Sequence, residues 1–278
     1  MKKLLIIISI AVCVITGRAE DIVRPVLSSW MLTTGPAHRA DTYLSPLHYR
    51  GWNIGVGYER FQATGFAPDR WVRALDIDVN VDRRLNPVRN SELWGAGLSG
   101  RWALMRRYSI RPDVDLGIGG ATSLDVGALY MSRNGNNPVA ANASWTIDLS
   151  AYAVWRFNIG RLPVVALYRA TLPVVGAFFS PDYGQLYYEI YLGDSGGVVR
   201  PAYWGSYFSL DQRLTVDLRL GSTSLRLGYG VNIRSTKADD IISRRINHVA
   251  VIGVAGEWMS LSPGNKLDPE VRVISAIY

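Results

Sequence analysis

The clearest pattern in the chain is a strict alternation of apolar and polar side chains between residues 211 and 233. Residues 214–220 place Leu or Val at every second position, and residues 225–233 repeat the pattern after a short Gly-Ser-Thr connection at 221–223. Alternation with a period of two puts the two sets of side chains on opposite faces of a strand. The stretch therefore predicts a β-hairpin with one apolar face and one charged face.

The same alternation recurs over most of the chain. It predicts further strands at 23–34, 49–62, 75–81, 94–104, 110–130, 145–157, 162–174 and 247–259, with weaker candidates at 187–192 and 271–278. Gly, Pro and Asn mark connections between them. The long connections are expected at 35–48, 83–92, 131–143, 177–203 and 234–245, and the tight ones at 106–108, 158–161 and 221–223.

Aromatic residues sit near both ends of the apolar faces, as in the pairs Trp52 and Tyr58, Trp94 and Trp102. Two aromatic girdles about 25 Å apart flank the lipid-facing band of an outer-membrane barrel, and they would produce this spacing. The fold predicted is all-β, a transmembrane antiparallel up-and-down β-barrel. The alternative is a secreted β-sandwich whose apolar faces meet in a core.

Connection lengths bear on the number of strands, because periplasmic turns are short and surface loops are long. With the first strand rising, the long and tight connections alternate correctly through ten strands. Counting the weaker candidates 187–192 and 271–278 as strands gives twelve. Chain length favours about twelve strands, with ten as the alternative.

The first 19 residues have the pattern of a secretory signal peptide: Lys2 and Lys3, then an apolar core, then a small-residue site ending at Ala19. Cleavage after Ala19 would leave residues 20–278 as the barrel and remove Cys13, the one cysteine. It would also remove three of 30 basic residues against 23 acidic ones, lowering the net charge from +7 to +4. This modest excess does not indicate nucleic-acid binding. The predicted location is the outer membrane of a Gram-negative bacterium.

The polar faces of the predicted strands form a candidate lumen network of acids and arginines. Its members are Glu59, Asp76, Asp78, Asp82, Arg101, Arg111, Asp113, Asp115, Asp125, Asp148, Arg156, Arg169, Asp217, Arg219, Arg226 and Glu257. Interleaved charges in a narrow barrel are typical of an ion-paired plug. The alternative is a polar path whose acid-rich wall favours cations.

The connection 178–207 is rich in aromatic residues. The candidate residues there are Tyr183, Tyr187, Tyr188, Glu189, Tyr191 and Trp204. Aromatic faces beside carboxylates bind sugars, fold inward as a plug, or simply pack a loop and girdle. The basic residues Arg234, Lys237, Arg244 and Arg245, if they point outward, suit the phosphates of surface lipids.

Catalytic and metal motifs are sparse. None of the three histidines is followed two residues later by Ser, as it is in outer-membrane enzymes resembling phospholipase A or lipid A deacylase. The least unfavourable catalytic cluster is His48 with Ser45 and Asp41, against a plain reading as an ordered loop. The sequence has no glycine-rich phosphate loop and no metal-type histidine cluster, so it predicts no cofactor and no metal.

Several stretches together resemble a family of outer-membrane β-barrels of the Bacteroidetes type whose function is unassigned. They are DTYLSPLHYRGWN at 41–53, GYERFQ at 57–62, LYYEIYLG at 186–193, LTVDLRLGSTSLRLGYG at 214–230 and GEWMSLSP at 256–263. The resemblance spans most of residues 20–278. It implies a barrel in the outer membrane and implies no activity.

Three hypotheses about function follow. The first is a non-enzymatic, porin-like barrel that acts as a narrow or gated channel or as a structural protein. The second is a membrane-embedded hydrolase acting on lipids or lipopolysaccharide, and the third is a surface receptor that binds glycan or protein through the aromatic connection 178–207. The partners expected are outer-membrane lipids and lipopolysaccharide, the barrel-assembly machinery, and a small solute or glycan.

Overall fold

The computed structural model of the protein describes residues 22–135, 137–193, 196–259 and 271–278. The predicted signal peptide at 1–19 and the predicted break at 260–269 lie outside these residues. The described elements in chain order are β1 (Val26–Asp41), β2 (Ser45–Ala63), β3 (Trp71–Leu85), β4 (Glu92–Arg111), β5 (Val114–Tyr130), β6 (Val139–Ile159), β7 (Leu162–Phe179), α2 (Tyr187–Tyr191), β8 (Val199–Ala202), β9 (Tyr207–Leu220), β10 (Thr223–Ala238) and β11 (Ile241–Trp258).

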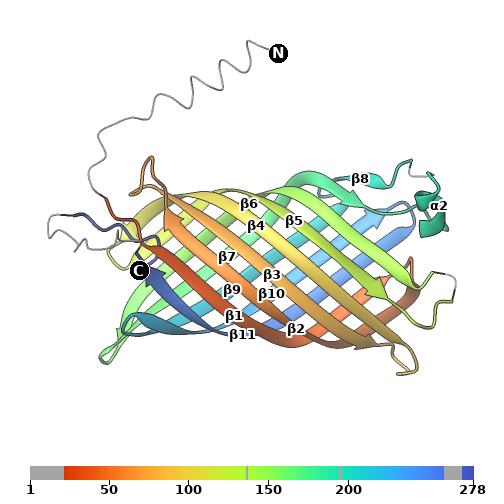
Figure 1. The fold of residues 1–278 in the computed structure, drawn as a ribbon, viewed down its shortest axis with the longest axis horizontal. Coiled ribbons are helices and arrows are strands. Elements are labelled where there is room, and N and C mark those ends of the chain that lie inside the picture. Colours follow the sequence, from red (N-terminus) through yellow and green to blue (C-terminus); the bar gives the residue numbers. More distant parts are fainter. Residues whose placement is uncertain (1–21, 136, 194–195, 260–270) are drawn as a thin grey trace, which may run out of the picture.

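Ten of the eleven strands in the described residues close into one antiparallel barrel (Figure 1). Each strand pairs with its neighbour in sequence, β7 pairs with β9, and β1 pairs with β11 to close the ring. The short strand β8 pairs only with the end of β7 and stands outside the ring. The all-β up-and-down barrel is therefore confirmed, with ten strands rather than twelve.

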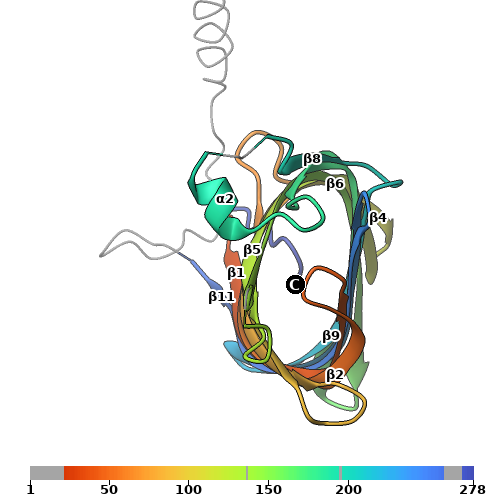
Figure 2. The ribbon, with the colours of Figure 1, turned by 90° about the vertical axis from the view of Figure 1, so that its right-hand side faces the viewer.

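The prediction of two additional strands, which would have given twelve in total, is wrong. Residues 187–191 form the helix α2, which lies at one end of the barrel (Figure 2). Residues 271–278 make one isolated bridge, between Val23 and Val273, and then enter the barrel. Period-two alternation over so few residues does not distinguish a strand from a short helix or an extended segment.

The predicted loop at 35–48 is also wrong, because β1 runs to Asp41 and β2 begins at Ser45. Gly35-Pro36 does not end the strand. The pairing of β1 with β11 is interrupted between Thr34 and Ala37, while the pairing of β1 with β2 continues through Pro36. The missing N–H of proline is thus accommodated by a local gap on one side of the strand.

The predicted turn at 106–108 is wrong in the same way, since β4 continues to Arg111 and the turn is at 112–113. Ile110 and Arg111 therefore belong to β4 and not to the following strand. Charged and aromatic residues suggested a turn here, but they continue the strand, with the Arg106 guanidinium 5.3 Å from the Tyr108 ring centroid.

Connections of different length gather at the two ends of the barrel. We call the end with connections 64–70, 112–113, 160–161 and 221–222 the proximal mouth, because the chain enters β1 there. The distal mouth has connections 42–44, 86–91, 131–138, 180–206 and 239–240. The longest connection, which contains α2, is distal (Figure 1). The long connections predicted at 83–92, 131–143 and 177–203 are distal, and the tight ones predicted at 158–161 and 221–223 are proximal. The connection 64–70 at the proximal mouth is longer than the distal turns 42–44 and 239–240, so the predicted alternation holds only in part.

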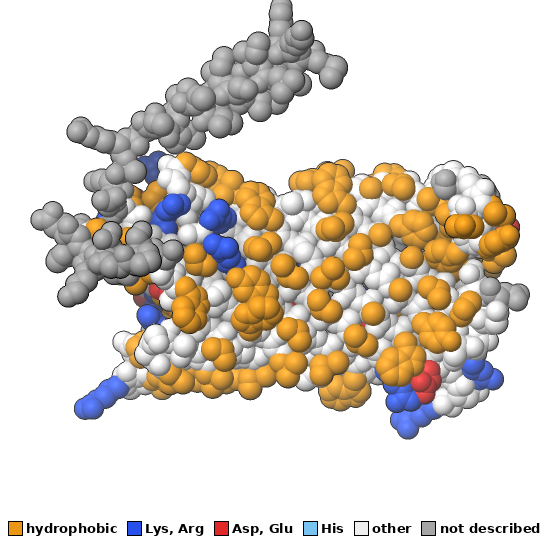
Figure 3. Space-filling model, viewed as in Figure 1, with side chains coloured by type: hydrophobic (Ala, Val, Ile, Leu, Met, Phe, Trp, Pro, Cys, Tyr) orange, Lys and Arg blue, Asp and Glu red, His pale blue; other side chains and the backbone are white. Residues whose placement is uncertain are grey.

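The outer surface of the barrel is apolar. Trp52 is 66% exposed, and Leu, Ile and Val cover the middle of the wall while Lys and Arg gather toward the two ends (Figure 3). The apolar faces thus point away from the molecule instead of meeting in a core. This overturns the sandwich alternative and leaves the alternate residues of every strand to fill the lumen.

The lumen has apolar layers at both mouths. The proximal layer includes Leu27, Phe61, Met105 and Tyr152, with Ile277 of the segment 271–278 among them. The distal mouth has two smaller clusters, whose members are Leu44, Tyr49, Leu93, Leu129, Met131 and Ala140 in one, and Phe178, Ala202, Tyr207 and Ala238 in the other. Charged side chains occupy the region between these layers.

Candidate functional site

Five charged residues form a continuous chain of ion pairs in the proximal half of the lumen. Arg226 holds Asp217 with two hydrogen bonds of 2.7 Å, and its Nη1 also contacts Glu59. Arg169 joins Glu59 at 2.6 Å to Asp76 at 2.7 Å. We call these five residues the proximal network. Arg226 is 0% exposed, so its charge is balanced entirely inside the barrel.

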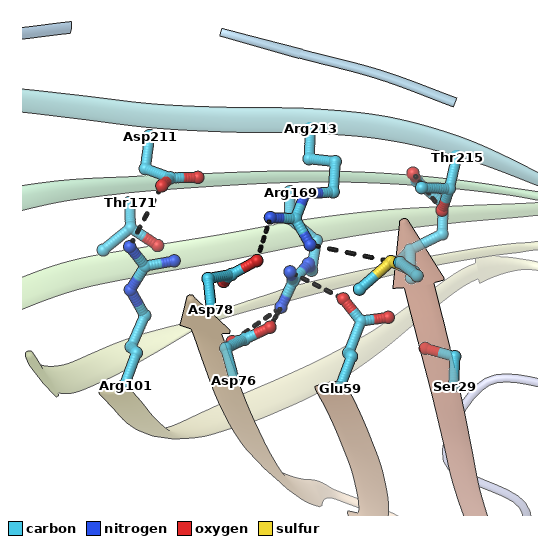
Figure 4. A network of polar contacts seen from close by, with 12 residues as sticks. Ser29, Glu59, Asp76, Asp78, Arg101, Arg169, Thr171, Asp211, Arg213 and Thr215 are labelled. Carbon is cyan, nitrogen blue, oxygen red and sulfur yellow. Dashed lines mark hydrogen bonds and ion pairs between the residues drawn. The ribbon is translucent and has the colours of Figure 1, made fainter. Parts of the chain in front are cut away.

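Strand register brings this network together. Arg226 lies directly opposite Asp217 across β9 and β10, and Glu59 lies opposite Asp76 across β2 and β3. Side chains at such positions are about 5 Å apart at their Cβ atoms, which suits a long side chain paired with a short carboxylate. Arg169 then spans the lumen from β7 to reach both acids of the second pair (Figure 4).

A second set of pairs lies beside the proximal network (Figure 4). Arg213 contacts Asp78 at 3.1 Å and the Met31 sulfur at 3.7 Å, and Arg101 lies 3.4 Å from Asp211. Five further predicted members, Asp82, Asp115, Asp125, Asp148 and Arg156, have partners elsewhere in the lumen. These contacts are Arg156–Asp115 at 2.6 Å, Arg234–Asp125 at 2.7 Å, Arg84–Asp82 and Ser123–Asp148.

Two predicted members lie outside the network. Arg111 is exposed at the end of β4, and Asp113 lies in the turn before β5. Their prediction followed from the wrong turn at 106–108, which had assigned both to one long strand.

Glycine residues on the lumen face leave room for neighbouring side chains. A Cβ atom on Gly95 would lie 2.7 Å from the Asp82 carboxylate, and one on Gly117 would collide with the Tyr152 ring.

Sequence reasoning missed several charged residues of the lumen. Arg213 and Asp211 continue the phase of Asp217 on β9, which extends further back than the alternation suggested. The others lie in stretches that had been assigned to loops. They are Arg39, Asp41, Arg84, Arg234 and Arg245. Continuing the alternation through Gly35, through 83–92 and through 234–245 would have identified them.

The C-terminal segment (residues 271–278) occupies the proximal mouth. The Tyr278 hydroxyl donates to Asp217 at 2.7 Å, and the Arg219 guanidinium stacks 4.6 Å from the Tyr278 ring centroid. Arg156 Nε donates to the Ile277 carbonyl at 2.8 Å, and Ser275 Oγ donates to Glu257. The predicted lumen residues Arg219 and Glu257 thus hold this segment.

The structure does not bring the candidate catalytic residues together. Asp41 is buried on the lumen side and accepts from Ser243 Oγ at 2.8 Å, and Ser45 Oγ accepts from the Tyr49 hydroxyl at 3.4 Å. His48 is exposed one position before the buried Tyr49, so it lies on the outer face. A base on the outer face cannot take a proton from a hydroxyl on the lumen side.

The aromatic connection divides into packed and exposed residues. The Tyr187 hydroxyl accepts from the Ala141 N–H at 2.6 Å, and burial raises the pKa of Tyr187 to about 12. Trp204 Nε1 donates to the Pro173 carbonyl at 2.6 Å, and Glu189 caps α2 by accepting from the Leu186 N–H at 2.7 Å. Tyr183, Tyr188, Tyr191, Trp204 and Glu189 are exposed. Binding of glycan or protein there stays a prediction.

The basic residues assigned to the connection at 234–245 lie on both faces of the wall. The predicted connection at 234–245 is wrong, because β10 runs to Ala238 and β11 begins at Ile241. Arg234 and Arg245 lie on these strands and point into the lumen, so they do not meet the condition of facing outward that lipid binding requires. Arg244 is exposed on the outer face at the distal mouth. There it lines a groove of about 270 Å³ with His38, His48 and Arg50.

The described part of the chain contains no group of three or more His, Cys, Asp or Glu side chains arranged to hold a metal ion. No helix among the described residues is both long and apolar enough to cross a membrane.

Comparison with solved structures finds other barrels. The β-domain of the Bordetella autotransporter Brka is 12% identical, with a TM-score of 0.40 over 84% of this chain and 100% of that chain. The translocator domain of the autotransporter NalP from Neisseria meningitidis is 8% identical, with a TM-score of 0.30 over 92% and 95%. The P. putida toluene transporter TodX is 8% identical, with a TM-score of 0.28 over 87% and 91%. Similarity at this level concerns the barrel architecture and no more.

No curated protein matches the chain. A family model described as "Protein of unknown function (DUF3316)" matches residues 3–265.

Proposed function

Because the chain belongs to the DUF3316 family, whose function is unknown, we propose its role from the barrel itself: a gated passage for small solutes in an outer membrane. The observation that carries this proposal is the position of the C-terminal segment. It fills the proximal mouth without being a strand of the barrel, and charged lumen lies behind it.

The outer membrane is the location that the surface supports. A closed barrel with an apolar outer band satisfies its backbone hydrogen bonds within the wall, which a lipid environment requires. The two longest connections, 131–138 and 180–206, support an orientation with the distal mouth outside the cell and the proximal mouth in the periplasm. The proposal includes a cleaved signal peptide at 1–19. It also includes a Gram-negative source of the Bacteroidetes type.

The outer face at the distal mouth suits lipopolysaccharide. His38, His48, Arg50 and Arg244 surround the groove of about 270 Å³, and guanidinium groups bind phosphate oxygens well. In this orientation the groove lies at the level of the outer-leaflet headgroups. Surface lipid is thus a proposed partner of the wall, separate from any solute in the lumen.

Closure at the proximal mouth depends on side-chain contacts and one isolated bridge. Val23 and Val273 form one bridge, Ile277 packs in the apolar layer, and Tyr278 reaches Asp217. None of these contacts is part of the ladder between barrel strands, so the segment can leave while the barrel stays closed as a ring. Withdrawal of the segment would connect the periplasm to the polar lumen.

Planar-bilayer recording of a variant that lacks residues 271–278 tests the gate. We expect the full chain to be closed for most of the recording and the shortened chain to conduct steadily. The matched control is Arg272→Gln, which changes an exposed residue of the same segment that pairs with Asp69. It should behave like the full chain.

Heat-modifiable migration in gels shows whether each variant has kept a folded barrel. A folded, shortened chain that conducts no better than the full chain would sink the gate. It would leave a closed structural barrel as the function. No observation favours the hydrolase, since His48 lies apart from Ser45 and Asp41.

A further inference from the structure

Three arginines stand side by side in the distal half of the lumen. Arg245 of β11 lies directly opposite Arg234 of β10 on one side and Arg39 of β1 on the other. We call these three residues the distal row. Like charges directly opposite each other destabilise a sheet, so three adjacent guanidinium groups require compensation.

The protein supplies only part of that compensation. Arg234 pairs with Asp125 at 2.7 Å, and Arg39 lies 3.4 Å from Asp41. Among the described residues Arg245 forms no ion pair with a carboxylate, and its Nη2 donates instead to the neutral Asn232 amide oxygen at 2.8 Å.

Hydrogen-bond donors remain unused at this level. The Nε groups of Arg39, Arg234 and Arg245 are buried and have no hydrogen-bond partner in the described part of the chain. Arg39 is 6% exposed, so its free donor has been removed from bulk water. A buried donor without a partner costs about 1–3 kcal/mol, and more for a charged group.

A fourth arginine has the same property. Arg84 of β3 contacts Asp82 and lies 3.4 Å from the Asn247 amide oxygen, and its Nε also has no partner among the described residues. Four arginines therefore meet the three carboxylates of Asp41, Asp82 and Asp125. Within this set of seven side chains the arginines exceed the carboxylates by one.

A cavity opens onto the distal row. Its volume is about 50 Å³, and its lining includes all three arginines together with the paired carboxylates Asp82 and Asp125. A second cavity of about 80 Å³ shares Arg234, Arg245 and Asp125 with the first and is also lined by Asp78 and Asp211, which pair with Arg213 and Arg101. One water needs about 10–15 Å³ by such a measure, so these spaces hold several waters or a small ion.

We propose that the distal row binds a small oxyanion, such as inorganic phosphate, sulfate or the carboxylate of a small solute. Guanidinium forks match the paired oxygens of these groups, and the site offers free N–H donors together with excess positive charge. The claim that such an anion is the transported solute rests on the proposed function. The claim that the distal row binds an anion rests on the geometry of the site alone.

Isothermal titration calorimetry of the full chain in detergent, without lipopolysaccharide, tests the site. Sodium phosphate, sodium sulfate and sodium acetate are titrated separately into a chloride buffer of constant ionic strength. We expect saturable binding of at least one of them. Arg245→Gln should weaken it about tenfold or more, because a charge-assisted hydrogen bond is lost.

Arg73→Gln is the control. Arg73 is an exposed arginine on the outer face and lines neither cavity of the distal row, so its loss should change the dissociation constant by less than about twofold. Arg245→Lys keeps the charge and loses the fork, and it should give intermediate affinity. Arg245→Lys also provides the test of the site if Arg245→Gln fails to fold.

Two results would overturn the site: no saturable binding of any of the three anions, or equal binding by wild type and the folded Arg245 variants. The bilayer experiment fails independently. If anions bind but the shortened chain does not conduct, the passage is refuted and the binding site is supported. If the shortened chain conducts but no anion binds, the binding site is refuted and the passage is supported.

Discussion

The two halves of the lumen use the same residue types in different arrangements. In the proximal network the signs alternate from Asp217 through Arg226, Glu59 and Arg169 to Asp76. In the distal row three arginines adjoin one another across β10, β11 and β1. The proximal charges compensate one another inside the fold, and the distal charges do so only in part.

This difference separates a structural set of charges from one that suits a ligand. A buried ion pair contributes little net stability, but removing one partner leaves an uncompensated charge. The proximal network can therefore hold the wall and the C-terminal segment together without binding anything. The distal row, in contrast, leaves donors and charge for an anion from outside the chain.

The largest effect is expected from breaking the proximal network at Arg226. Arg226→Gln leaves Glu59 and Asp217 buried with less compensation, so the free energy of unfolding should fall by about 3–5 kcal/mol. Urea unfolding of the barrel in lipid vesicles, followed by tryptophan fluorescence, measures the change. The control is Arg73→Gln, an exposed outer residue, which should alter stability by less than about 0.5 kcal/mol.

A variant that neutralises Arg226 and both of its acidic partners separates the effect of charge from the effect of packing. The triple variant Arg226→Met, Glu59→Gln, Asp217→Asn removes the charges together, so it should recover most of the lost stability. If the single and triple variants are equally unstable, the effect of Arg226 comes from packing and not from its charge.

The barrel itself was predictable from sequence because its signal is distributed over many residues. Alternation in 214–220 and 225–233 recurs in strand after strand, and each repeat indicates the same two-faced wall. The strand ends were harder to predict, because Pro36 and the basic pair at 106–107 have the composition of loops. Backbone pairing with a neighbour, which a single sequence does not display, decided both cases.

Half of the candidate site was predictable for the same reason. Glu59, Asp76 and Arg226 alternate with clearly apolar neighbours, so their face was evident. The distal row lies where the strands extend beyond the apolar band. There some of the outward-facing residues are also polar, so apolar and polar positions no longer alternate clearly. Its omission also made the lumen look acid-rich and cation-selective, whereas Arg39, Arg84, Arg213, Arg234 and Arg245 offset those acids.

An intermediate effect is expected where the C-terminal segment meets the proximal network. Tyr278→Phe removes the hydrogen bond to the Asp217 carboxylate and leaves the Arg226 contacts in place. The free energy of unfolding should fall by about 1.5–3 kcal/mol, the range for a hydrogen bond to a charged group. Tyr183→Phe changes an exposed tyrosine at the distal mouth and should have no measurable effect. Equal stability of the Tyr278→Phe and wild-type barrels would uncouple the segment from the network.

The smallest effect, of opposite sign, is expected in the distal row. Arg245→Glu places a carboxylate between Arg234 and Arg39, so it replaces two like-charge neighbours with two opposite-charge neighbours. In phosphate-free buffer the free energy of unfolding should rise by about 0.5–1 kcal/mol, seen as a higher urea midpoint at constant slope. Arg244→Glu, on the outer face, should not reproduce the gain. A loss of stability in Arg245→Glu would mean that the fold already compensates Arg245, and the distal row would then be built on the same principle as the proximal network.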